Sequence, residues 1–304
     1  MTKHLDAKFY IRPDRANTVQ GSLPSRARGV VRFCRQRPLG AVGGFIFLLM
    51  AATALLAGWI APYDPLVNDY KAMMSPPSIS HPMGTDAHGR DVLSRIIYGS
   101  RTALLVGFSS SFFGVTLGAI IGVICAYFGG RTDVVVQRFM EILLSFPLIV
   151  MALAMMAVLG TGVLNVIVAI TIPMIPRSAQ VIRSSALSIR SMPYVDAARA
   201  SGFGHARIMF RHILPNVMAP YLILVTAYLG GAILTEASLS FLGVGVAEPI
   251  PAWGLMLKGA AVSFAETAPW MAVFPGLAIS AAVFAFNIFG DSLRDELDPK
   301  LRTS

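Results

Sequence analysis

Four side chains that can bind a metal ion or transfer protons lie between residues 81 and 91: His81, Asp86, His88 and Asp91. A metal site would need ligands placed together, for example a pair four residues apart on a helix with a third donor behind it. No pair in this segment has that arrangement. Helix initiation by Asp86 or Asp91, whose carboxylates can accept backbone N–H groups, explains the same residues more simply. We therefore expect no metal site here.

The sequence also lacks the common motifs of hydrolases and nucleotide-binding proteins. H-E-x-x-H, G-x-S-x-G and G-x-x-x-x-G-K-[ST] are all missing. These motifs would supply zinc ligands, an exposed nucleophile and a phosphate-binding loop, respectively. We therefore predict a non-catalytic chain with no cofactor of its own. If ATP drives its function, a different polypeptide must bind that ATP.

Two polar side chains, Glu236 and Asn287, fall inside otherwise apolar runs. A carboxylate at membrane depth is expected to face a cavity or a partner rather than lipid. Glu236 can contact the amino group of a passing solute or a metal ion, or it can bond to a neighbouring helix. Asn287 has the same alternatives, a solute contact or an interhelical hydrogen bond. Glu141 is expected to pair with an arginine or with water.

The elements that position these residues are long apolar runs. Of 304 residues, 55% are hydrophobic and 13% are charged, whereas soluble domains have about 25% charged residues. A helix needs about 20 apolar residues to cross a bilayer. Six runs qualify or nearly qualify: 39–61, 102–128, 134–159, 163–182, 216–243 and 269–290. The sequence therefore predicts an all-α polytopic membrane protein with six transmembrane helices.

The run 163–182 is the least regular of the six, because Pro173, Pro176 and Arg177 interrupt it. Neighbouring helices or water can satisfy the backbone groups that proline frees, so we retain it as a span.

The distribution of basic residues indicates the orientation of the spans, since Lys and Arg are retained on the cytoplasmic side. Residues 1–38, the two connections after the second and fourth runs, and the C-terminal tail together hold 20 of the 25 Lys and Arg. The loops 62–100 and 244–268 hold four, and Arg101 lies at a boundary. This predicts that both termini are cytoplasmic and that these two loops are external. The net charge of +9 is explained by topology, so we exclude nucleic acid as a partner.

Two further patterns bear on packing. Apolar side chains at 92, 93, 96 and 97 alternate with polar ones at 90, 91, 94 and 95, which is typical of an amphipathic helix at the outer membrane surface. Glycines at 107, 114, 118 and 122 give the second run a face of small residues. Such a face suits close helix packing, either within this chain or against a partner.

The stretch DAARASGFGHARIMFRHILP, residues 196–215, separates the fourth and fifth runs. Ser191 is expected to cap a helix whose first turn contains Pro193 and Asp196. Gly202 and Gly204 then allow a sharp turn into a second helix that runs to Pro215. An alanine-rich face can enter a groove on another protein, or it can pack on the chain's own bundle. Composition alone leaves both alternatives open.

This stretch resembles the EAA loop of bacterial ABC-importer permeases, whose pattern is E-A-A, three residues, Gly, nine residues, then I-x-L-P. Asp196, Ala197 and Ala198 match with Asp for Glu, and Gly202 falls at the required offset. Leu214 and Pro215 close the pattern, whereas His212 stands in place of Ile. RHILPN resembles the ending of this loop in the peptide-importer branch.

Other segments resemble the same branch, namely the dipeptide, oligopeptide and nickel permeases. They are APYDP, HPMGTDAHGRDVLSRIIYGSRTALLVG, FLGVG and the ending FPGLAISAAVFAFNIFGDSLRDELDPKLR. The resemblance covers nearly everything from residue 36 onward.

The resemblance implies the type I ABC-importer permease fold in the bacterial inner membrane. It implies docking of Asp196 to Gly202, including Arg199, on a cytoplasmic ATPase, with His212, Leu214 and Pro215 completing the motif. The expected partners are a homologous permease, two ATP-binding subunits that hold ATP and Mg, an external binding protein and membrane lipid. The expected cargo is a peptide, a glutathione-like thiol, an opine, a nickel chelate or a sugar.

The expected organisation has four parts. They are a basic cytoplasmic tail 1–38, a first span with an external loop and interfacial helix 39–101, a five-span core 102–290 with a coupling loop 183–215, and a cytoplasmic tail 291–304.

Two alternative functions remain. A self-sufficient channel or ion-coupled carrier would show more polar residues in its spans. An intramembrane enzyme would need a Ser/His or paired-Asp constellation, and none is found in the sequence.

Overall fold

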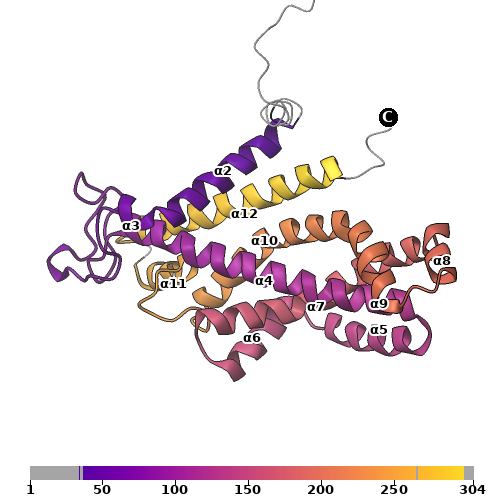
Figure 1. Ribbon diagram of the computed structural model, residues 1–304. Coiled ribbons are helices and arrows are strands. Elements are labelled where there is room, and N and C mark those ends of the chain that lie inside the picture. Colours follow the sequence, from indigo (N-terminus) through magenta and orange to yellow (C-terminus); the bar gives the residue numbers. More distant parts are fainter. Residues whose placement is uncertain (1–33, 35–36, 265, 298–304) are drawn as a thin grey trace, which may run out of the picture. The chain divides into compact units, whose positions relative to one another are not determined.

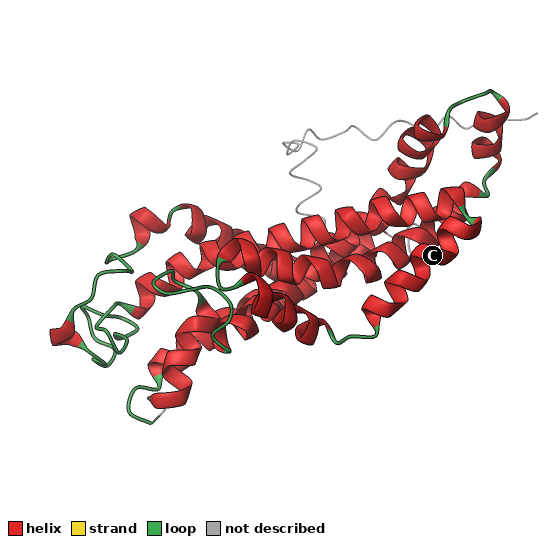
Figure 2. Cartoon of the chain, turned by 90° about the horizontal axis from the view of Figure 1, so that it is seen from below, coloured by secondary structure: helices red, strands yellow, loops and turns green. Residues whose placement is uncertain are grey.

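The computed structural model describes residues 34, 37–264 and 266–297, and all of its regular elements in these ranges are helical (Figure 2). Contacts divide the chain into Met1–Pro38 and Leu39–Ser304, and the account below concerns the second unit. Most of the predicted tail 1–38, and the last seven residues of the predicted tail 291–304, lie outside the described residues.

The helices in chain order are α2 (Pro38–Leu55), α3 (Ala57–Ile60), α4 (Val92–Phe128), α5 (Gly130–Leu144), α6 (Leu148–Leu159), α7 (Val163–Arg190), α8 (Pro193–Ala200), α9 (His205–Ile208), α10 (Met218–Phe241), α11 (Trp253–Ser263) and α12 (Trp270–Leu297) (Figure 1). A 3₁₀ turn, Tyr70–Ala72, lies in the loop before α4, and a π turn and a 3₁₀ turn join α9 to α10. Loop 61–91 and α8 lie at opposite ends of the long helices (Figure 1). We call these the loop end and the hairpin end.

Five helical segments in the described residues are long and apolar enough to span a membrane, and a bent pair makes up to six. The five are Pro38–Leu55, Val92–Phe128, Val163–Arg190, His205–Phe241 and Trp270–Glu296. The predicted run 163–182 is therefore confirmed as a continuous helix, although both of its prolines lie inside α7.

The predicted run 134–159 is not one straight helix. It divides into α5 and α6, which meet at an angle of 88°. Pro147 stands at the break as the N-cap of α6. Because proline has no N–H and disfavours helical backbone at the residue before it, the chain turns here.

The predicted separate interfacial helix is also wrong. Residues 92–101 are the first turns of α4, which continues without a break to Phe128. With 37 residues, α4 is about 55 Å long, so it extends beyond the roughly 30 Å apolar layer. Its polar face is covered, since Ser94 and Arg95 are buried, and Val92 of the apolar stripe is buried as well. Asp91 caps this helix as predicted, because its Oδ2 accepts the N–H of Ser94 at 2.8 Å.

The centre of the bundle is the contact between α4 and α7. At Gly118 a Cβ atom would come within 2.5 Å of the Ser178 Cβ, and at Gly122 within 2.6 Å of the Ala179 carbonyl oxygen. Ser110 donates from its hydroxyl to the carbonyl of Ile167 across the same contact. The small-residue face is thus used for packing within this chain, one of the two alternatives for it.

Replacing Gly118 with alanine is expected to destabilise the protein by about 1–3 kcal/mol, because the added methyl overpacks the contact between α4 and α7. Gly231 in α10 has open space where its Cβ would be, so Gly231→Ala is the matched control. Thermal unfolding in detergent compares the two variants. Equal midpoints for both would show that the contact does not limit stability.

Candidate functional site

The hairpin consists of α8, a turn at residues 201–204, and a second helical arm that starts at His205. Pro193 occupies the first turn of α8, as predicted. Ser191 does not cap the helix: its hydroxyl donates to the Ser188 carbonyl at 2.9 Å, and the N-cap is Met192. Gly202 adopts φ +77°, a left-handed conformation that glycine reaches without strain, and so reverses the chain.

One face of α8 is buried against the rest of the chain. Val195 is fully buried and Ala198 is 6% exposed, in a cluster that includes Ile189 of α7 and Tyr127 of α4. Ala198 therefore packs α8 against the bundle, on the side of the helix away from its exposed residues, and its predicted role in docking stays a prediction. The exposed residues of α8 include Asp196, Ala197, Arg199 and Ala200.

The second arm does not end at Pro215 as predicted. The helical path runs from His205 through the π and 3₁₀ turns into α10 and ends at Phe241. The His212 ring stacks on Phe203, with centroids 6.0 Å apart. The His212 carbonyl accepts the Asn216 side-chain amide at 2.7 Å. His212 thus stabilises the hairpin from inside.

Leu214 is half-buried against the same core as Ala198, whereas Pro215 is exposed. The residues of the resembling motif therefore divide into two groups. Ala198, His212 and Leu214 hold the hairpin together, and Asp196, Ala197, Arg199, Gly202 and Pro215 are accessible from outside.

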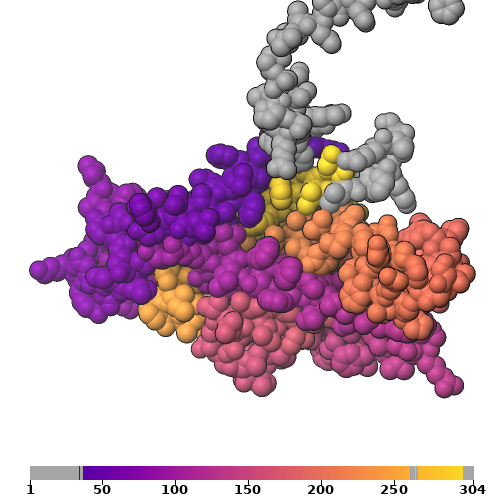
Figure 3. All heavy atoms as spheres, in the orientation of Figure 1, coloured from indigo at the N-terminus to yellow at the C-terminus, as the bar shows by residue number. Residues whose placement is uncertain are grey.

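The C-terminal end of α4 is fastened to the hairpin by an aromatic and cationic cluster. The hydroxyl of Tyr127 is hydrogen-bonded to Nδ1 of His205 at 2.8 Å. The Arg199 guanidinium lies 5.4 Å from the centre of the Tyr127 ring, a cation–π contact. Figure 3 shows the atoms of the hairpin, coloured orange, at the right-hand end of the molecule. Sequence reasoning missed Tyr127, which is distant in the chain and unremarkable in type.

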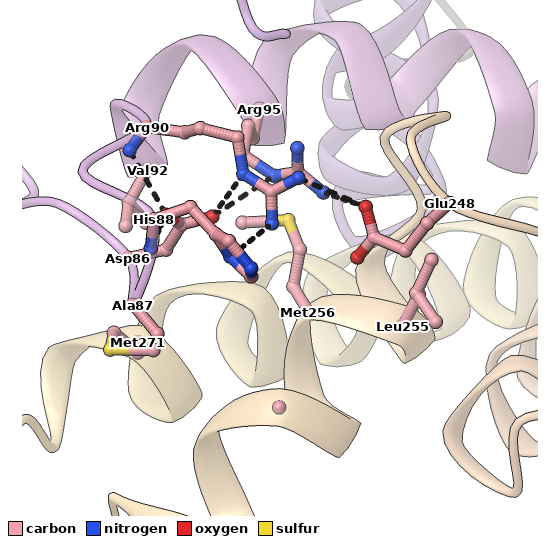
Figure 4. A pocket seen from close by; sticks show the side chains of 11 residues that line it. Asp86, Ala87, His88, Arg90, Val92, Arg95, Glu248, Leu255, Met256 and Met271 are labelled. Carbon is pink, nitrogen blue, oxygen red and sulfur yellow. Dashed lines mark hydrogen bonds and ion pairs between the residues drawn. The ribbon is translucent and has the colours of Figure 1, made fainter. Parts of the chain in front are cut away.

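The loop end contains a cluster of two arginines and two carboxylates (Figure 4). Arg90 donates from Nε to Asp86 at 2.6 Å and from Nη1 to Glu248 at 2.9 Å. Arg95, 1% exposed, lies 3.7 Å from Asp86 and 3.9 Å from Glu248. These pairs join the loop before α4 to the loop after α10.

The protonation of Arg90 is secured by this cluster. Burial of its guanidinium lowers the pKa, but the hydrogen bonds and charges of Glu248 and Asp86 outweigh burial and raise the pKa above its ordinary value. Arg90 therefore stays charged and holds both loops.

The histidines of the loop end are explained by hydrogen bonds. His81 Nδ1 lies 3.0 Å from Asp91, the residue that caps α4, and His88 Nδ1 lies 3.2 Å from Arg90. No group of three potential ligands able to hold a metal occurs in the described ranges.

The two candidate pathway residues differ in exposure. Glu236 is 1% exposed and accepts a hydrogen bond from the Ser240 hydroxyl at 2.7 Å. The same hydroxyl accepts the N–H of Val246 at 3.1 Å, so Glu236 supports the turn that follows α10. This geometry favours the structural alternative for Glu236. Asn287 is exposed on α12 and lies against Gly230 of α10.

Comparison with known proteins places this architecture in a family. Residues 114–303 match the family described as the binding-protein-dependent transport system inner membrane component. Residues 25–77 match the N-terminal transmembrane domain of oligopeptide transport permease C.

Two relatives align over most of the chain. The sequence is 41% identical over 273 residues to the glutathione transport system permease protein GsiD of Pectobacterium atrosepticum, covering 90% of each chain. It is 40% identical over 272 residues to the di/tripeptide transport system permease protein DppC of Pseudomonas aeruginosa, covering 87% of this chain and 89% of that one.

A solved structure has the same fold. A chain of the MetNI methionine ABC transporter, in an inward facing conformation, aligns with a TM-score of 0.55 at 20% identity, covering 68% of this chain and 97% of that chain. With the helices long enough to span a membrane and the match over residues 114–303, the chain belongs to the family of binding-protein-dependent transport system inner membrane components.

Proposed function

We propose that this chain is a permease subunit of an ATP-driven importer of peptides or peptide-like solutes such as glutathione. The proposal is supported by the names of the two relatives, a glutathione and a di/tripeptide permease, each aligned over most of this chain. The substrate would be delivered by an external binding protein, and the pathway would be formed with a homologous permease. The chain itself would be non-catalytic, and ATP and Mg would be held by two partner subunits.

The proposed orientation places both termini and the hairpin in the cytoplasm. The basic residues support it, since the connections on the hairpin side and the two tails hold 20 of the 25 Lys and Arg. The loop end and the hairpin end lie at opposite ends of the long helices (Figure 1). To have these two ends on opposite sides of the membrane, α5 and α6 together must cross it once.

The single observation that supports coupling to an ATPase best is the two-sided hairpin. The outer face of α8 presents Asp196 and Ala197, whereas Arg199, although exposed, turns its guanidinium toward the Tyr127 ring of α4. The inner face is locked by Val195 and Ala198 to α4 and α7. A displacement of α8 would therefore move the bundle, and the continuous path from His205 to Phe241 would carry it into α10. An ATP-driven movement of a docked partner could thereby bias an inward- and outward-open equilibrium.

The function is tested by uptake in a strain lacking its own peptide and glutathione importers. Expression of the chain with its neighbouring genes is expected to give uptake of labelled glutathione or a labelled dipeptide. Deleting the ATP-binding subunit or the binding protein should abolish that uptake. Uptake by this chain alone, driven by an ion gradient, would instead support the self-sufficient carrier.

A further inference from the structure

Residues 73–82 are an exposed apolar segment of the loop before α4. The segment, MMSPPSISHP, has no Asp, Glu, Lys or Arg. Ile79, in the turn at residues 78–81, has a relative exposure of 103%. The exposed apolar residues of the segment are Met73, Pro76, Pro77, Ile79 and Pro82. Because exposed apolar residues are normally scattered singly, a run of this kind marks an interaction surface. We call residues 73–82 the ridge.

The ridge is held in one conformation by hydrogen bonds and by proline. Its turn is closed by the N–H of Ser78, which donates to the His81 carbonyl at 2.9 Å. At its base, the N–H of Met74 donates to the Asp86 carbonyl at 3.0 Å. Three prolines restrict its backbone further. A surface fixed in this way loses little conformational entropy when a partner binds.

The ridge lies beyond the outer surface of the membrane in the proposed orientation. Trp59 in α3 is 91% exposed and marks the interface, where tryptophan is enriched. Neighbouring Gly58 lies beside the Tyr98 hydroxyl of α4. Asp91 lies about 10 Å from Tyr98 along α4, toward the loop end, and it binds His81 of the ridge at 3.0 Å. Lipid therefore lies below the ridge, and a protein in the external solution can reach it.

The base of the ridge is tied to the outer ends of three helices. His81 binds Asp91, the N-cap of α4. Thr85, which pairs with Ser75 at the base, accepts the indole N–H of Trp270 at 3.1 Å through its carbonyl, and Trp270 begins α12. The adjoining cluster of two arginines and two carboxylates reaches the loop after α10. A protein docked on the ridge would therefore act on α4, α10 and α12 together.

We propose that the ridge is a docking site for the external solute-binding protein, with Ile79 as its main apolar contact. This inference rests on the proposed function and orientation. The partner surface that it fits is an apolar pocket without charged groups, because the ridge has no Asp, Glu, Lys or Arg. A second permease would pack along the spans, whereas the ridge belongs to the loop at the end of the long helices (Figure 1).

The test measures binding of the purified external binding protein, encoded by a neighbouring gene, to the complete complex in lipid nanodiscs. Ile79→Asp is expected to weaken binding about 10- to 100-fold, as the loss of a main apolar contact does. Ile79→Leu keeps that contact and should bind nearly as tightly as the native complex. Val67→Asp is the matched control and should bind normally, since Val67 is exposed in the same loop but outside the ridge. Because both positions are exposed, neither aspartate should change the thermal midpoint of the complex.

Replacing Ile79 with the photoreactive benzoylphenylalanine identifies what the ridge touches. In membranes that contain the complete complex, irradiation is expected to join this residue to the external binding protein. An adduct with the second permease or with lipid would overturn the inference, and so would native binding by Ile79→Asp or an equal loss in Val67→Asp. A native complex that binds no external protein and takes up neither glutathione nor a dipeptide would count against the proposed function itself, so the two claims fail separately.

Discussion

Replacing Ala197 with tryptophan is expected to reduce uptake at least tenfold while the chain still folds and inserts. Ala197 is exposed on the outer face of α8, so a large side chain there disturbs no internal packing. It would hold α8 away from a close-fitting partner, and a cost of about 1.4 kcal/mol already corresponds to a factor of ten in affinity. Uptake and the amount of ATPase that co-purifies are the two measurements.

Two further variants isolate the docking face. Ala52→Trp places the same side chain on an exposed position of α2 and should leave uptake unchanged. Ala198→Leu adds bulk to the buried face, so it should lower the thermal stability of the chain first. Native uptake and full ATPase recovery with Ala197→Trp would remove α8 from the coupling mechanism.

Replacing Arg90 with methionine is expected to lower the free energy of unfolding by about 3 kcal/mol. This value lies near the lower end of the cost of breaking a buried ion pair, because the Glu248 side chain is 52% exposed. The change removes both hydrogen bonds that join Asp86 to Glu248 through one guanidinium. Among the described residues, it leaves Asp86 with only the more distant Arg95 as a cationic ion-pair partner. Unfolding in detergent measures the loss.

Arg138→Met is the matched control, since Arg138 also pairs with a glutamate but is 77% exposed. Exposed pairs of this kind contribute about 0–1 kcal/mol. In addition, Glu248→Gln should cost less in the Arg90→Met background than in the native chain, because the pair is already broken. Equal losses for Arg90→Met and Arg138→Met would show that the cluster does not join the two loops.

Much of the fold follows from the sequence because spanning helices are a property of local composition. Five of the six predicted runs coincide with the helical segments able to span. Gly202 and Pro193 were also assigned correctly, since a left-handed turn and a first helical turn are local demands. The break at Pro147 was missed because the apolar composition continues on both sides of it.

The rest depends on contacts between distant residues, which a single sequence does not reveal. Arg95 was expected to face water on an amphipathic helix at the membrane surface. In the structure it is buried and lies close to the carboxylates of Asp86 and Glu248. Ala198 was assigned to docking through its match to the E-A-A motif, and the packing of Ala198 in the cluster with Tyr127 and Ile189 depends on contacts that the motif does not specify. Arg177 was counted as an interruption of a span, yet α7 continues through it without a break.

Chemical cross-linking from residue 197 tests the central claim most directly. Cys34 is exposed and is replaced with serine, whereas buried Cys125 is retained. In membranes containing the complete complex, Ala197→Cys is expected to cross-link to an ATP-binding polypeptide, and Ala52→Cys is not. If Ala197→Cys forms no such cross-link in membranes that still take up peptide or glutathione, the hairpin does not dock on an ATPase and the account is contradicted.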